Sequence, residues 1–124
     1  MNLSLNRVVL YVQDVPRLVA FYRGLLGLPV VEEWRDEWAV LRAGHCEIAL
    51  HRAGKAFRNL DAGLSWEKSN AKLVLAVEGD MAALRKKLMD NGVAMREIKS
   101  YTGFTGPICD GTDPEGNVFQ LAQQ

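Results

Sequence analysis

Apolar and polar positions follow one another along the chain in blocks that predict strands and helices in a definite order. The β-branched and aromatic run 8–12 predicts a strand. Asp14 and Pro16 have the character of a helix start, and apolar residues at helical spacing then lead to Gly27, a residue typical of a helix end. Further strands are predicted at 28–34, 37–43 and 45–51. The first half is therefore expected to be β-α-β-β-β.

The second half repeats this plan. Run 73–77 predicts a strand, Asp80 a helix start, and Gly92 the end of that helix. Three more strands are predicted at 93–98, 107–110 and 117–122. Val12 and Val77, in matching positions, are 65 residues apart by their numbers in the sequence. A repeat of this length indicates a duplicated module rather than a solenoid, which would need three or more copies.

The predicted fold class is α+β, with two tandem β-α-β-β-β modules in a single domain. Module 1 covers about 1–54, a connecting segment 55–70, and module 2 about 71–124. One helix covers only one face of a four-stranded sheet, so each module leaves its other face open. Two modules, or two chains, placed edge to edge would form a curled sheet around a cleft, where ligand sites are favoured.

Composition narrows the classes of function. The chain has 124 residues and balances 15 Lys plus Arg against 15 Asp plus Glu, so it lacks the basic face expected for nucleic-acid binding. No apolar run reaches the ~18 residues of a membrane span, and the N-terminus lacks the features of a signal peptide. Cys46 and Cys109 have no ligand spacing and are expected to be reduced and buried, with a disulfide as the minor alternative. These features predict a cytoplasmic protein.

Three segments carry a family resemblance: 7–14 (RVVLYVQD), 21–28 (FYRGLLGL) and 113–121 (DPEGNVFQL). In combination they resemble the glyoxalase/bleomycin-resistance/extradiol-dioxygenase family, also called the vicinal oxygen chelate superfamily, over nearly the whole chain. Paired β-α-β-β-β modules are the fold of that family. These motifs specify the fold and say little about chemistry, because 113–116 has the sequence of a type I turn.

The resemblance also implies where a metal would bind. Metal-dependent members carry His and Glu ligands at four positions, which fall here on Arg7, Ala49, Lys72 and Gln120. None is a usual metal ligand, and the cationic side chains of Arg and Lys repel a divalent ion. We therefore expect no cofactor. The alternative is a glyoxalase-type lyase or isomerase that uses one Zn, Ni, Mn or Fe ion on a displaced ligand set.

Glu47 and His51 are the candidates for a displaced set, because strand alternation places both on the cleft face. The competing interpretation is that His51 lies at a strand end and that Glu47 pairs with Arg7 or Arg42. It is favoured because strand residues four apart are separated by ~13 Å, too far to share one ion. A third alternative is general acid–base catalysis by Glu47 or His51, with Arg7 or Lys72 holding an anion.

Several aromatic residues fall outside the predicted core. Trp34 and Trp38 flank a turn, Trp66 lies in the connecting segment, and Tyr101 and Phe104 lie in a long loop. In non-catalytic members that the sequence resembles, such rings line a cleft that sequesters a flat or cationic drug. For Trp34 and Trp38, a place in the helix-facing core or in a dimer interface explains the sequence as well as a place in this cleft does.

We therefore expect a binding protein, in a homodimer, for a small hydrophobic, planar or cationic molecule. A domain that binds a protein partner would instead expose an apolar patch. The predicted ligand-contacting residues are Arg7, Tyr11, Trp34, Trp38, Glu47, His51, Trp66, Lys72, Tyr101, Phe104 and Gln120.

Overall fold

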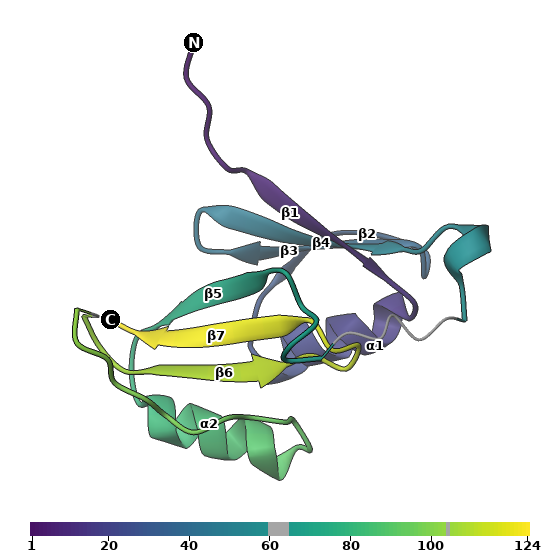
Figure 1. Ribbon diagram of the computed structural model, residues 1–124. Helices are drawn as coiled ribbons and strands as arrows, with labels where there is room; N and C mark the ends of the chain where they lie inside the picture. Colours follow the sequence, from purple (N-terminus) through teal and green to yellow (C-terminus); the bar gives the residue numbers. More distant parts are fainter. Residues whose placement is uncertain (60–64, 104) are drawn as a thin grey trace. The chain divides into compact units, whose positions relative to one another are not determined.

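The computed structural model describes residues 1–59, 65–103 and 105–124, and the chain divides into two compact units, 1–61 and 62–124 (Figure 1). Each unit combines helix and sheet, which confirms the predicted α+β class. Within the described ranges, no helix has the length and apolar character needed to cross a membrane.

The first unit contains a four-stranded sheet covered on one face by a helix (Figure 1). Its elements are β1 (Arg7–Val12), α1 (Val15–Val19), the π-helical segment η1 (Ala20–Leu25), β2 (Val30–Trp34), β3 (Trp38–Ala43), β4 (Cys46–Arg52) and the short 3₁₀ helix η2 (Lys55–Phe57). The strand order is β1-β4-β3-β2. Strand β1 runs parallel to β4, and the other pairs are antiparallel.

The helix of the first unit begins as predicted. The carboxylate of Asp14 accepts a hydrogen bond from the backbone N–H of Arg17 at 3.1 Å, so it satisfies one of the free donors of the first turn. The second half of this helix, η1, is a π-helix, which no pattern in the sequence predicted. Gly27 follows with a φ of +73°, a left-handed conformation that ends the helix.

The core of the first unit lies between α1 and the sheet. Leu18 of the helix packs in the same layer as alternate strand residues, and each of these side chains is almost fully buried: Val12, Ala39, Leu41, Ile48 and Leu50. Ala39 lines a pocket together with Val15 and Val19 of the helix and pairs with Leu50 across the strands, so the even-numbered positions of β4 face the helix, as predicted. The odd-numbered positions therefore project from the opposite side, where the candidate site must be sought.

The second unit contains β5 (Lys72–Val77), α2 (Met81–Asp90), β6 (Ile108–Thr112) and β7 (Val118–Gln123). Its sheet has the order β5-β7-β6, with β5 parallel to β7. The strand predicted at 93–98 is wrong, because the segment pairs with β6 irregularly. Backbone N–H groups of Arg96 and Lys99 donate to Asp110 and Ile108, but the register shifts by one residue between the isolated bridges Met95–Gly111 and Lys99–Ile108, so no continuous ladder forms.

The two units match each other at the positions the repeat predicts. Arg7 and Lys72 are each the first residue of a leading strand. Asp80 caps α2 by accepting from the N–H of Ala83 at 3.0 Å, as Asp14 caps α1. Gly92, with a φ of +82°, follows α2 as Gly27 follows the first helix. The two units therefore have matching helix caps, leading-strand starts and helix ends.

Candidate functional site

The face of the first sheet opposite α1, called the open face below, is built from three rows of side chains. Residues paired across β3, β4 and β1 point to the same side of the sheet. The pairing gives a charged row, a small apolar row and an aromatic row: Arg42, Glu47 and Arg7; Val40, Ala49 and Val9; Trp38, His51 and Tyr11. Strand pairing thus brings together five of the sequence-predicted residues.

The aromatic row is a chain of ring contacts. The His51 ring lies 5.4 Å from the Tyr11 ring and 5.5 Å from the Trp38 ring, measured between centroids, and it meets the indole edge-on at 80°. Trp34 pairs with Trp38 in the β2–β3 ladder and extends the row. Tyr11 is 72% exposed and Trp34 is 58% exposed. The alternative that Trp34 fills the helix-facing core is therefore wrong.

The charged row is an ion-paired cluster. Glu47 Oε1 accepts from Arg7 Nε at 3.1 Å and from Arg7 Nη2 at 2.9 Å, and Arg42 Nη2 lies 3.8 Å from Glu47 Oε2. This confirms the expectation that Glu47 pairs with an arginine. The Arg7 guanidinium also lies over the Trp38 ring, with its carbon 5.5 Å from the centroid. Arg7 thus links the charged row to the aromatic row.

The apolar row forms the floor between these two rows. Ala49 lies at its centre and is fully buried, as is Val40 beside it, while Val9 is 40% exposed. The small side chain at 49 leaves the neighbouring Arg7 and Trp38 close enough for their cation–π contact. The floor is therefore flat and apolar, with aromatic rings along one side and charges along the other.

The residues of the first unit at the implied metal positions do not fit a divalent ion. Ala49 has no donor atom, and Arg7 places a permanent positive charge beside the carboxylate of Glu47. The structure places His51 against two rings and not beside Glu47. Over the described ranges, no group of three His, Cys, Asp or Glu side chains is arranged to hold a metal.

The second unit carries a different polar cluster on its own helix-free face. Asp110 Oδ2 accepts from Lys72 Nζ at 2.7 Å, and Asp110 Oδ1 accepts from Gln120 Nε2 at 2.9 Å. Sequence reasoning missed Asp110 as the centre of this cluster. The available signal was its alternation with the apolar Cys109, which places the carboxylate on the opposite side of β6. An ammonium group again stands at an implied metal position, which therefore does not fit a divalent ion.

The remaining predicted residues lie elsewhere in the second unit. Trp66 is half-buried, with the Arg96 guanidinium carbon 4.5 Å from its ring centroid. Tyr101 is 49% exposed. Phe104 lies outside the described residues. Trp66 thus has a local cationic partner, which the sequence did not indicate.

The two cysteines are free, and they differ in environment. Cys109 is almost fully buried, and its thiol donates to the backbone carbonyl of Arg96 at 3.2 Å. Burial raises the pKa of the Cys109 thiol, which keeps it protonated and unreactive. Cys46 is half-buried, so the expectation that both are buried is wrong for this one. It lies at the start of β4, where the core layer ends.

Comparison with solved structures shows the same fold in proteins of several activities. The chain is similar to TnmS3, an antibiotic binding protein from Streptomyces sp. CB03234, with 21% identity, a TM-score of 0.75, and coverage of 99% of this chain and 98% of that one. A lactoylglutathione lyase from Agrobacterium tumefaciens matches with 14% identity, a TM-score of 0.74, and 97% and 92% coverage. The fosfomycin resistance protein FosX from Listeria monocytogenes matches with 11% identity, a TM-score of 0.72, and 100% and 93% coverage.

A family model gives the same assignment from sequence. Residues 4–121 match the model described as Glyoxalase/Bleomycin resistance protein/Dioxygenase superfamily. The match includes β1, both α-helices and the first four residues of β7, and it confirms the resemblance carried by the three sequence motifs. The chain belongs to the glyoxalase/bleomycin resistance protein/dioxygenase superfamily.

Proposed function

We propose that this protein binds a planar, aromatic small molecule on the open face of its first unit, without a metal ion, as a drug-sequestering protein would. The observation that carries the proposal is the row of contacting rings Trp38, His51 and Tyr11. These rings, of which Tyr11 is 72% exposed, offer a flat ligand stacking partners, and the half-exposed Val9 beside them adds apolar area. Each such aromatic contact contributes about 0.5–1.5 kcal/mol beyond area burial.

The charges on this face favour an anionic or neutral ligand over a cationic one. Arg7, Arg42 and the Arg35 guanidinium over Trp34 contribute three positive charges, and Glu47 and Glu32, which pairs with Val40, contribute two negative charges, which leaves a net charge of +1 on the face. The Arg7 guanidinium already occupies a cation–π position over Trp38. A planar cation would therefore compete with Arg7, whereas a planar anion would be attracted to the row.

Two of the similar structures support a small-molecule role. TnmS3 is described as an antibiotic binding protein and FosX as a fosfomycin resistance protein. One protein with this fold thus binds an antibiotic and another is a resistance protein, and the proposal extends small-molecule binding to a planar ligand here. A metal-dependent lyase or isomerase is the second candidate, because a lactoylglutathione lyase shares the fold. The poor fit of Arg7 and Ala49 to a divalent ion disfavours it.

Fluorescence titration tests the proposal with a matched pair of tricyclic probes, anthracene-9-carboxylate and 9-aminoacridine. Both are flat, and they differ in the sign of their charge. In buffer containing a chelator, we expect the carboxylate to quench tryptophan fluorescence saturably and to bind more tightly than the amine. Equal, unsaturable quenching by both probes would contradict the proposal. Saturable binding that requires added Zn²⁺, Ni²⁺, Mn²⁺ or Fe²⁺ would support the metal-dependent candidate instead.

A pair of variants locates the binding. Tyr11→Val removes a ring that is 72% exposed and ends the aromatic row, and we expect it to weaken binding of the carboxylate roughly two- to tenfold. Phe57→Val is the matched control, since Phe57 is 66% exposed in the same unit but belongs to η2. Equal effects of the two changes would show that binding does not depend on the aromatic row.

The homodimer is also a proposal, and it competes for the same exposed rings. Trp34 and Tyr11 have the exposure and chemistry of interface residues. Light scattering across a concentration series measures the mass directly, and the Tyr11→Val variant shows whether this face takes part. A dimer that weakens with Tyr11→Val would assign the aromatic row to self-association. If the probes then also failed to bind saturably, ligand binding at this row would be contradicted.

A further inference from the structure

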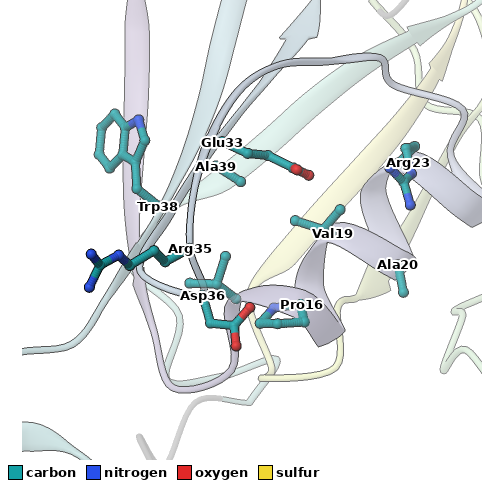
Figure 2. Close-up of a pocket in the computed structure, with 10 residues that line it drawn as sticks. Pro16, Val19, Ala20, Arg23, Glu33, Arg35, Asp36, Trp38 and Ala39 are labelled. Atoms are coloured by element: carbon teal, nitrogen blue, oxygen red, sulfur yellow. The ribbon is translucent and has the colours of Figure 1, made fainter.

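The first unit has a pocket on the other side of its sheet, between the helix and the β2–β3 hairpin (Figure 2). Its volume is about 210 Å³. Its lining comes from α1, η1, the end of β2, the hairpin turn and the start of β3, and it includes Val15, Val19, Arg23, Glu33, Asp36 and Ala39. This volume lies below the 300–1,000 Å³ typical of sites for drug-sized ligands, so it suits a small metabolite-sized molecule.

The inner wall of the pocket is apolar and well ordered by packing. Val15, Val19 and Ala39 are each buried to more than nine-tenths, and they belong to the core between helix and sheet. Trp38 contributes its base, while its indole points away from the pocket (Figure 2). The pocket and the aromatic row therefore use opposite sides of β3.

Charges of both signs surround this apolar wall. Glu33 and Asp36 come from the hairpin, and Arg23 comes from η1 across the pocket. Figure 2 shows the Glu33 carboxylate extending towards the helix, over Val19. Within the described parts of the chain, none of these three side chains forms an ion pair.

Two other carboxylates of the first unit are paired: Glu47 with Arg7, and Glu37 with Arg52 at 3.0 Å and with Arg58 at 3.6 Å. Glu33 and Arg23 are exposed and both line the cavity without pairing with each other, so both charges are available to a ligand there.

Arg35 completes the wall without adding charge to the interior. Its guanidinium carbon lies 4.9 Å from the Trp34 ring centroid, and Figure 2 shows the group directed away from the pocket. The backbone at Arg35 has a φ of +51°, in the left-handed region, where the tight turn between β2 and β3 holds it. The turn thereby places Asp36 at the pocket and turns the Arg35 charge outwards.

We propose that this pocket is a second ligand site, for a small zwitterion that carries an ammonium and a carboxylate on a short apolar body. Glu33 receives the ammonium, Arg23 receives the carboxylate, and Val15, Val19 and Ala39 contact the apolar part. Charge-assisted hydrogen bonds of this kind discriminate strongly, because a ligand that lacks one charge leaves its partner unmatched. Free amino acids with aliphatic side chains have this chemistry.

Three matched probes separate the contributions. L-leucine carries both charges, 3-methylbutylamine lacks the carboxylate, and 4-methylpentanoate lacks the ammonium. We expect amide chemical shifts of α1 and of the β2–β3 hairpin to move saturably with millimolar leucine, and roughly tenfold weaker binding of either single-charge analogue. Absence of saturable shifts with leucine up to its solubility would overturn the proposal. So would amine binding as tight as leucine binding, since Arg23 would then play no part.

Charge-neutral variants with matched controls test the assignment of roles. Glu33→Gln should weaken leucine about tenfold, whereas Glu32→Gln, on the same strand but facing the opposite side, should leave it unchanged. Arg23→Gln should weaken leucine and spare the amine, with Arg17→Gln as its control. Ala20→Leu fills the pocket from an exposed helical position and should abolish binding. Leucine binding that survives Ala20→Leu would place the ligand elsewhere.

These results are independent of the proposed function. Anthracene-9-carboxylate is too large for this pocket and is expected on the open face, and its affinity should not change with Ala20→Leu. Failure of leucine binding with intact anthracene-9-carboxylate binding would remove the second site alone.

Discussion

Arg7 and Glu47 stand directly opposite each other on the parallel strands β1 and β4, and two hydrogen bonds of 3.1 and 2.9 Å join the guanidinium to one carboxylate oxygen. The pair fixes a positive charge at the first position of the leading strand. It also holds the guanidinium near the Trp38 ring. One cross-strand ion pair therefore accounts both for the poor fit of this position to a metal and for the preference proposed for anionic planar ligands.

The Arg7–Glu47 pair should contribute little to stability despite its geometry. The Arg7 side chain is 32% exposed and that of Glu47 is 19% exposed, so water screens much of the attraction. A double-mutant cycle with Arg7→Gln and Glu47→Gln, measured by urea unfolding, should give a coupling energy of about 1 kcal/mol or less. A coupling above about 3 kcal/mol would show that the pair is a structural element rather than part of the binding face.

Asp113 should be much more important for folding. Its buried carboxylate accepts from the N–H groups of Glu115 and Asn117 at 2.9 and 3.0 Å, and from Asn117 Nδ2 at 2.9 Å. Asp113→Ala leaves these donors unmatched in the turn before β7, and we expect it to lower the free energy of unfolding by about 2–4 kcal/mol. Asp90→Ala, which removes only an exposed pair with Lys86, should change it by less than about 0.5 kcal/mol. Similar losses for both variants would contradict this account of the turn.

Two glycines of the first helix region should respond in opposite directions to alanine. Gly24 lies within η1, and a Cβ there would meet no atom within 4 Å. Gly24→Ala should therefore stabilise the protein by roughly 0.4–1 kcal/mol through the unfolded chain. Gly27 also has open space, but its φ of +73° is strained for a residue with a Cβ. Gly27→Ala should destabilise by about 1–2 kcal/mol, and thermal melts of the two variants check the opposite signs.

Cys109 should make stability fall in alkaline solution. Burial raises the pKa of its thiol, with the nearby Asp110 and Glu97 acting in the same direction and Arg85 opposing them. Between the ordinary thiol pKa of about 8.5 and the raised value, the unfolded chain loses a proton that the folded chain retains. The free energy of unfolding therefore decreases as pH rises through this window.

Replacing this thiol isolates its contribution. Cys109→Ala lowers stability at every pH by creating a cavity, but its free energy of unfolding should fall less steeply than that of the wild type above pH ~8.5. Parallel curves for the two proteins in urea unfolding at a series of pH values would show that the thiol is not the titrating group.

Much of the fold follows from local signals in the sequence. Asp14 and Asp80 were predicted as helix caps, and both accept the expected backbone hydrogen bonds. Gly27 and Gly92 were predicted as helix ends, and both adopt positive φ. These features depend on the residue and its near neighbours. A strand at 93–98 depends instead on its register with β6, which shifts by one residue between the two isolated bridges.

The candidate sites could be predicted from the sequence less completely than the fold, because strand register and side-chain direction depend on contacts between segments that are distant in the sequence. Alternation along β4 placed Glu47 and His51 on one side of the sheet, and the expected pairing of Glu47 with Arg7 or Arg42 is confirmed, but nothing in the sequence indicated that Tyr11 would lie beside His51. The pocket residues Glu33 and Arg23 carry no signal in the sequence. They face one cavity only because η1 and the β2–β3 hairpin lie next to each other.

The most direct test of metal-independent binding on the open face is a map of the chemical-shift changes that anthracene-9-carboxylate causes in the protein, measured in buffer that contains a metal chelator. We predict saturable shifts centred on Tyr11, Trp38 and His51, with the Trp38 indole N–H among the largest. Shifts confined to the second unit, or the absence of binding until a divalent metal is added, would contradict a metal-independent site on the open face of the first unit.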